Sequence, residues 1–109
     1  MSDDDTEPAD ERRDIDTGAL VDALARFGGS DAERRTVARQ AADLAASRKH
    51  ARDRSHPLTA DVVVHELADA REGSPAERWN WWMGALEVAY GGYEPFQVRR
   101  YPGGDDAQP

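Results

Sequence analysis

The stretch from Ser74 to Gly92 constrains the fold of this chain more than any other. Ser74, Pro75 and Glu77 have the spacing of a helix N-terminus, with a capping serine, a proline in the first turn and a glutamate that completes the capping box. Gly91 and Gly92 are typical of a helix end. Between these signals, apolar side chains recur on one helical face, at Trp79, Trp82, Met83, Leu86, Ala89 and Tyr90. We therefore expect a long helix over residues 75–90 that packs on the rest of the chain.

Three more helices are expected before it. Leu20, Leu24 and Phe27 recur at helical spacing, which predicts a helix over 16–27 that ends at Gly28. Ser30 and Glu33 have capping-box spacing and predict a helix over 30–52. Thr59 is the expected N-cap of a third helix that ends near residue 72.

The segment after the long helix has a different pattern. Pro95 prevents continuation of the helix, and Phe96, Gln97 and Val98 alternate as in a short strand. A single strand is not stable by itself, so we expect this segment to pack on the helices or to pair with another copy.

The two ends of the chain lack apolar periodicity. Residues 1–14 carry seven acids and two bases, a net charge of −5. Such segments bury too little surface to offset the entropy of ordering. The sequence thus predicts an all-α, compact four-helix domain over 14–101 with a short extended C-terminal segment, a disordered acidic tail over 1–13 and a disordered tail over 102–109.

Composition favours an intracellular protein. The 109 residues include no cysteine, which excludes disulfides and thiolate metal sites. No apolar run is long enough to span a membrane, and the acidic start differs from a signal peptide, so we expect a cytoplasmic location. One lysine against thirteen arginines and fourteen aspartates resembles the composition of halophile proteins, whose acidic surfaces stay solvated at high salt.

One feature of the long helix departs from simple amphipathicity. Trp81, Ala85 and Val88 lie opposite Trp79 and Leu86, where a surface helix is normally polar. Two interpretations remain open: a central helix buried on both sides, or a face that meets a partner. The second interpretation assigns partner binding to five residues: Trp81, Val88, Phe96, Val98 and Tyr101.

The middle of the chain carries a basic signal. Residues 34–56 hold seven bases and two acids, whereas residues 57–94 hold seven acids and two bases. A stripe formed by Arg35, Arg39, Lys49 and Arg52 could contact phosphates, which makes nucleic-acid binding an alternative. The acidic tail opposes this interpretation, and bases near a helix C-terminus also have a structural explanation in the helix dipole.

Signals for catalysis or metal binding are weak. Asp61, His65, Asp69 and Glu72 form one polar stripe, but no second helix carries matching ligands. No serine has a recognisable base partner. We therefore expect no enzyme activity, no cofactor and no metal site.

Three functions follow, in order of preference. The first is a non-enzymatic interaction or regulatory protein that self-associates, as a possible homodimer, or binds a protein partner, without a membrane. The second is a nucleic-acid-associated regulator. The third, a small metal-binding or catalytic domain, has the least support in the sequence.

Overall fold

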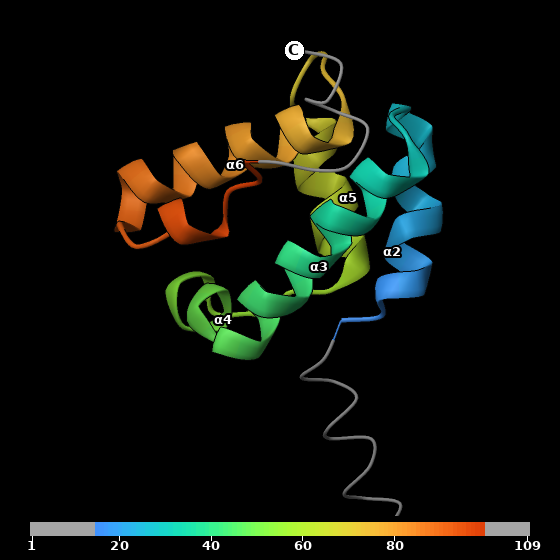
Figure 1. The fold of residues 1–109 in the computed structure, drawn as a ribbon. Helices are drawn as coiled ribbons and strands as arrows, with labels where there is room; N and C mark the ends of the chain where they lie inside the picture. The colour runs from blue at the N-terminus through green and yellow to red at the C-terminus, as the bar shows by residue number, and fades with distance from the viewer. Residues whose placement is uncertain (1–14, 100–109) are drawn as a thin grey trace, which may run out of the picture.

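A computed structural model describes residues 15–99, in which all the regular secondary structure is helical (Figure 1). Its elements, in order, are α2 (Thr17–Leu24), the 3₁₀ turn η1 (Ala25–Phe27), α3 (Asp31–Ser47), α4 (Lys49–Arg54), α5 (Ala60–Ala68), α6 (Pro75–Tyr90) and the 3₁₀ turn η2 (Glu94–Phe96). Within 15–99 no helix combines the length and the apolar character needed to cross a membrane.

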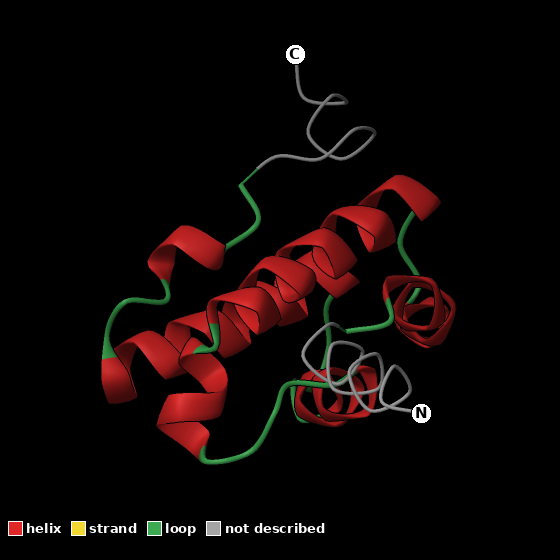
Figure 2. Cartoon of the chain, turned by 90° about the horizontal axis from the view of Figure 1, so that it is seen from below, coloured by secondary structure: helices red, strands yellow, loops and turns green. Residues whose placement is uncertain are grey.

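The helices cross one another around a single core. Both α3 and α5 contact α2 on one side and α6 on the other. The view in Figure 2 shows α2 and α5 end-on, across the direction of α6. The short helix α4 continues from α3, and η2 packs against both α3 and α6. Helix α6 therefore lies at one side of the fold.

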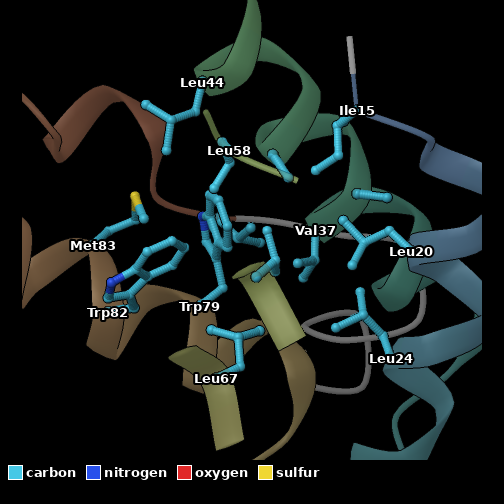
Figure 3. Close-up of a cluster of buried hydrophobic side chains, with 14 of the residues drawn as sticks. Ile15, Leu20, Leu24, Val37, Leu44, Leu58, Leu67, Trp79, Trp82 and Met83 are labelled. Atoms are coloured by element: carbon cyan, nitrogen blue, oxygen red, sulfur yellow. The ribbon is translucent and has the colours of Figure 1, made fainter. Parts of the chain in front are cut away.

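The apolar core is built mainly from α2, α3, α5 and α6, and Trp79 lies at its centre (Figure 3). Its ring has no exposed surface, and Val37, Leu58 and Leu67 surround it from three different segments. Fully buried aromatic rings contribute the largest apolar areas in a core of this size. The expected buried face of the 75–90 helix is thus confirmed at Trp79, Trp82, Met83 and Leu86 but is wrong at its end, where Ala89 and Tyr90 are exposed.

Side-chain caps begin four of the helices where the sequence indicates. Asp16 accepts from the Ala19 amide at 3.0 Å, and Thr59 accepts from the Val62 amide at 3.2 Å. At α6, Ser74 Oγ accepts from the Glu77 amide at 3.3 Å, while Glu77 Oε1 accepts from the Ser74 amide at 2.9 Å. This reciprocal pair confirms the predicted capping box and fixes the start of α6.

The second predicted capping box is wrong in one of its two bonds. Ser30 Oγ accepts from the Glu33 amide at 3.0 Å, as expected. The Glu33 carboxylate, however, accepts from the backbone amide of Ala76 at 2.8 Å. Glu33 is 5% exposed, so it is a buried acceptor for one of the free amides at the start of α6. It joins α3 to α6 across 43 residues of chain.

The prediction of four helices is also wrong, because residues 15–99 contain five α-helices. The helix expected over 30–52 ends at Ser47, and α4 begins at Lys49. Arg48 between them adopts a left-handed conformation with φ 64°. Ser47 Oγ donates to the Leu44 carbonyl at 2.7 Å and accepts from the Lys49 amide at 3.1 Å, so its side chain satisfies backbone groups at the break. The break turns His50 into the core.

The segment after α6 differs from the predicted strand. Residues 15–99 contain no strand, and Glu94–Phe96 forms η2 because Pro95 fits the first turn of a short helix. The chain becomes extended only from Gln97, whose ψ is 150°. The tails predicted over 1–13 and 102–109 lie outside the described residues.

Candidate functional site

Helix α6 carries all the large apolar side chains that residues 15–99 expose. They are Trp81, Val88 and Tyr90, which are 49%, 89% and 46% exposed. Every other helix of the described part buries its large apolar residues or covers them partly. The two sides of α6 therefore have different roles, and its four residues from Trp79 to Trp82 show the division most clearly.

Trp79 joins the core to the C-terminal segment. Its indole N–H donates a hydrogen bond to the carbonyl of Phe96 at 2.8 Å. Its ring meets the ring of Trp82 edge to face, with centroids 5.6 Å apart. A buried indole needs an acceptor for its N–H, and Phe96 supplies it. Trp79 thus positions η2 as well as filling the core.

Asn80 also binds the segment after η2, at Val98, two residues beyond Phe96. Its side-chain amide donates to the carbonyl of Val98 at 2.8 Å. Its side-chain oxygen accepts from the amide of Val98 at 2.7 Å. The side chain therefore pairs with the backbone of Val98 as a neighbouring strand does, and this explains how an extended segment is stable without a partner strand.

Trp82 packs against a buried histidine. Its ring lies edge to face with that of His50, with centroids 5.7 Å apart, and His56 closes the other side of His50 at 5.1 Å. His50 is 1% exposed. Burial, with the positive charges of His56 and Arg54 adding to it, lowers the pKa of His50 to about 4. The histidine is therefore neutral at pH 7 and belongs to the core.

A polar cluster secures the C-terminal end of α6. Glu87 accepts from the amides of Tyr93 at 2.7 Å and Glu94 at 2.9 Å, and these bonds lower the pKa of its carboxyl. The Tyr93 hydroxyl donates to Asp53 at 2.8 Å. That bond and the ammonium of Lys49 at 3.1 Å lower the pKa of Asp53. Burial and the Asp53 carboxylate together raise the pKa of Tyr93.

Trp81 stands apart from its three neighbours in the sequence. Its indole makes no hydrogen bond to any residue of the described part. Ala85 and Val88 continue its exposed stripe along the helix, and we call these three residues the outer face of α6. Beside Trp81, the turn before α6 forms a shallow hollow of about 410 Å³ lined by Asp69, Ala70, Arg71 and Glu72. Tyr90 lies on the other side of the helix, next to Tyr93, with ring centroids 6.3 Å apart.

The structure separates the five residues predicted to bind a partner. Trp81 and Val88 share the outer face, so they do not belong to the core. Val98 is 5% exposed and packs in the core, and Phe96 is partly buried against it. Val98 and Phe96 therefore do not extend the exposed surface formed by Trp81 and Val88. Tyr101 lies outside the described residues.

The four basic residues do not form one stripe. Arg35 pairs with Asp31 at 2.9 Å and lines, with Arg39, a groove of about 630 Å³ between α2 and α3. Asp22 also lines this groove, so acids accompany the bases. Lys49 pairs with Asp53 and lies 4.6 Å from the centre of the Tyr93 ring. Arg52 is exposed and donates to the carbonyl of Ser47 at 3.2 Å.

The polar stripe predicted on the third helix is not continuous, because α5 ends at Ala68 and not near residue 72, and Asp69 and Glu72 follow it. Asp61, His65, Asp69 and Glu72 are all exposed. Among residues 15–99 no group of three or more acidic or histidine side chains is close enough to hold a metal ion.

Comparison with known families adds one decisive observation. The profile described as the WNWW domain matches residues 1–87 of this chain. The matched residues include the tetrapeptide WNWW, which gives the family its description and corresponds to Trp79-Asn80-Trp81-Trp82. The chain belongs to the WNWW domain family. No curated protein and no solved structure matches it.

The WNWW tetrapeptide therefore consists of three residues with internal contacts and one exposed residue. The matched range ends at residue 87, before η2 and Val98, to which Trp79 and Asn80 bind. The sequence did not indicate Asn80 and His50 as structural polar groups, and it indicated a local partner for Glu33 in place of Ala76. For Asn80 a signal exists: an amide between two tryptophans in the middle of a helix needs partners that the helix itself does not provide.

Proposed function

We propose that this chain is a non-enzymatic interaction module that binds a protein surface through the outer face of α6. The observation that supports the proposal is the exposure of Trp81 beside three tetrapeptide residues that all have internal contacts. A half-exposed tryptophan that contributes little to the core is a poor choice for solubility. It is a favoured anchor in protein interfaces, because it buries a large area with few rotatable bonds.

The rest of α6 supports a rigid presentation of this face. The capping box fixes the start of the helix, Glu33 holds its first turn, and Glu87 fixes the backbone that follows its end. An interface anchored on a rigid helix loses less side-chain and backbone entropy on binding than one on a loop.

The test is affinity capture at matched salt with the full-length chain and three variants. Trp81→Ser and Val88→Ser change the outer face, whereas Tyr90→Ser removes an exposed aromatic from the other side of the same helix. We expect a stoichiometric partner, either another protein or the chain itself under a second tag, to bind wild type and Tyr90→Ser. Both outer-face variants should lose it while keeping wild-type helicity. Equal capture by all four proteins would contradict the proposal.

A further inference from the structure

We infer that α4 is a hinged flap that opens as one unit when the pH falls, while the other helices stay folded. Two features of the structure support this inference. The backbone is strained at both ends of α4, and the helix is held against α6 by a buried histidine whose site disfavours a proton. The flap comprises α4 with Arg48 before it and Ser55 after it.

The first feature is the backbone at the two ends of the flap. Arg48 and Ser55, with φ 64° and 67°, are the only non-glycine residues of the 15–99 range that have positive φ. Residues with a Cβ rarely adopt this conformation, because the Cβ comes too close to a neighbouring carbonyl oxygen. Opening of the flap relieves this strain, so these two residues are suited to act as hinges.

The helix between the hinges makes few contacts with the core. It has six residues and lies at the edge of the fold (Figure 1). His50 is its only buried residue. Because a helix this short is not stable by itself, its position depends on the contacts that hold it. The largest of these is the packing of His50 against Trp82.

Tyr93 provides a second hold on α4. Its hydroxyl donates to Asp53 at 2.8 Å, and the Lys49 ammonium lies 4.6 Å from the centre of its ring. The bond from Tyr93 and then that from Lys49 lower the pKa of the Asp53 carboxyl. Asp53 therefore stays ionised between pH 7 and pH 5, and this hold does not change in that range.

The second feature is the site of His50, which does change in this range. The ring lies between Trp82 and His56, and its Nδ1 has no hydrogen-bond partner among the described residues. The charged groups that face it are His56, when protonated, and Arg54, against the single carboxylate of Asp53. Trp82, which covers the ring from α6, has no charge. A proton on His50 would thus place a positive charge in a buried site that lacks an acceptor for it.

The closed and open flap therefore bind this proton with different strengths. Burial lowers the pKa of His50 to about 4 in the closed flap, whereas in water the histidine has its ordinary value of 6.5. The contribution of neutral His50 to closure is complete above pH 6.5 and is lost as the pH falls toward 4. The ratio of open to closed flap should rise about 20-fold between pH 7 and pH 5. Each opening removes the His50 ring from Trp82 and so uncovers part of the tetrapeptide.

Hydrogen exchange of the wild-type chain tests the inference. The amides of Arg52 and Ser55 donate to carbonyls inside the flap at 3.0 Å and 2.9 Å, so they report its opening. Their protection, corrected for the intrinsic rate, should be lower than that of the best-protected amides of α2 and α5, and should fall about 20-fold from pH 7 to pH 5.

Urea separates opening of the flap from unfolding of the whole chain. Opening of one short helix exposes little surface, so low concentrations of urea should hardly change the protection of the Arg52 and Ser55 amides. The best-protected core amides should lose protection steeply. Equal protection and equal urea dependence of the two sets would show that α4 leaves only on global unfolding, and would overturn the inference. Flap amides with the same protection at pH 7 and pH 5 would also overturn it.

Three variants assign the response to its residue. His50→Gln should make opening of the flap independent of pH between 5 and 7, whereas His65→Gln, on the exposed side of α5, should keep the 20-fold change. Tyr93→Phe removes the bond to Asp53 and should raise opening by the same factor at both pH values. A 20-fold change that persists in His50→Gln, or that disappears in Tyr93→Phe, would contradict the role of His50.

Discussion

The side-chain amide of Asn80 makes two hydrogen bonds to the backbone of Val98, a donated one of 2.8 Å and an accepted one of 2.7 Å. Through them, one helical side chain replaces the neighbouring strand that an extended segment otherwise requires. The segment after η2 therefore depends on α6, and specifically on the tetrapeptide that describes the family.

Asn80→Ala should loosen this segment selectively. Loss of both bonds leaves the Val98 amide and carbonyl without partners, at a cost of about 1–3 kcal/mol in the free energy of unfolding. Asn80→Asp should keep the acceptor and lose the donor, so that a carboxylate oxygen faces the Val98 carbonyl. Urea unfolding gives the stability, and hydrogen exchange gives the protection of the Val98 amide. An Asn80→Ala chain with wild-type protection at Val98 would show that the pairing is not what holds the segment.

Two adjacent glycines provide a matched pair for testing the contact between α3 and α6. Gly28 and Gly29 both have positive φ, 83° and 78°. A Cβ at Gly28 meets nothing within 4 Å, whereas at Gly29 it lies 2.7 Å from Pro75 Cδ and 2.8 Å from Glu33 Oε1. Both alanine variants carry the cost of a backbone conformation with positive φ, about 1–3 kcal/mol.

Gly29→Ala should therefore destabilise the chain by at least about 1 kcal/mol more than Gly28→Ala, because it adds the steric conflict. Thermal or urea unfolding of the two variants measures this difference. Equal stabilities would mean that the start of α6 can move away from Gly29 at little cost.

Glu33→Ala should cost about 1–3 kcal/mol, because the amide of Ala76 is buried and loses its acceptor. Glu33→Gln keeps an oxygen at the same place and should recover part of that loss. The measurement is urea unfolding of the three proteins under identical conditions. A glutamine variant no more stable than the alanine variant would indicate that the negative charge, and not the acceptor, is what α6 requires.

His50 should make stability depend on pH in the weakly acidic range. Its pKa is lowered to about 4 in the folded chain from 6.5, so the unfolded state binds the proton first as pH falls. The stabilising contribution is present above pH 6.5 and is lost progressively toward pH 4. The loss between pH 7 and pH 5 should be about 2 kcal/mol.

His50→Gln should remove this pH dependence, whereas the exposed His65→Gln should keep it. Urea unfolding at several pH values between 5 and 7 is the measurement. The carboxyls of Asp53 and Glu87, whose pKa values are lowered, lose their contribution at lower pH and so stay separate from this effect. A wild-type chain equally stable at pH 7 and pH 5 would contradict the assignment.

The sequence predicts the starts of the four expected helices correctly, because these starts are local signals, whereas two of the predicted ends are wrong: α3 ends at Ser47 and α5 at Ala68. Ser30, Thr59 and Ser74 cap the helices that follow them, and each accepts from an amide three residues further along the chain. Local signals fail where a distant partner competes. Glu33 satisfies Ala76, 43 residues away, in place of the backbone at its own helix start.

The break at Arg48 illustrates a second limit. Arginine favours helices, and neither glycine nor proline marks the position. The left-handed residue is stable because Ser47 bonds the backbone on both sides and because His50 gains a buried place against Trp82. Burial of a histidine in an aromatic pocket is a tertiary effect that periodicity does not show.

The sequence predicted the residues of the candidate site but not their exposure. The spacing of Trp81, Ala85 and Val88 identifies an unusual apolar face, but not whether other helices cover it. The arrangement of α3 and α5 on only one side of α6 decides that. The same arrangement places Val98 in the core, against an expectation that rested on alternation alone.

The stability of Trp81→Ala tests the central claim most directly, because the claim assigns Trp81 to binding and its three neighbours to folding. Urea unfolding at a concentration where the chain is monomeric is the measurement, with Trp79→Ala as the reference. We predict a loss within about 1 kcal/mol for Trp81→Ala, against about 3–5 kcal/mol for Trp79→Ala. A loss of several kcal/mol for Trp81→Ala in the monomer would show that its indole supports the fold, and would contradict the account.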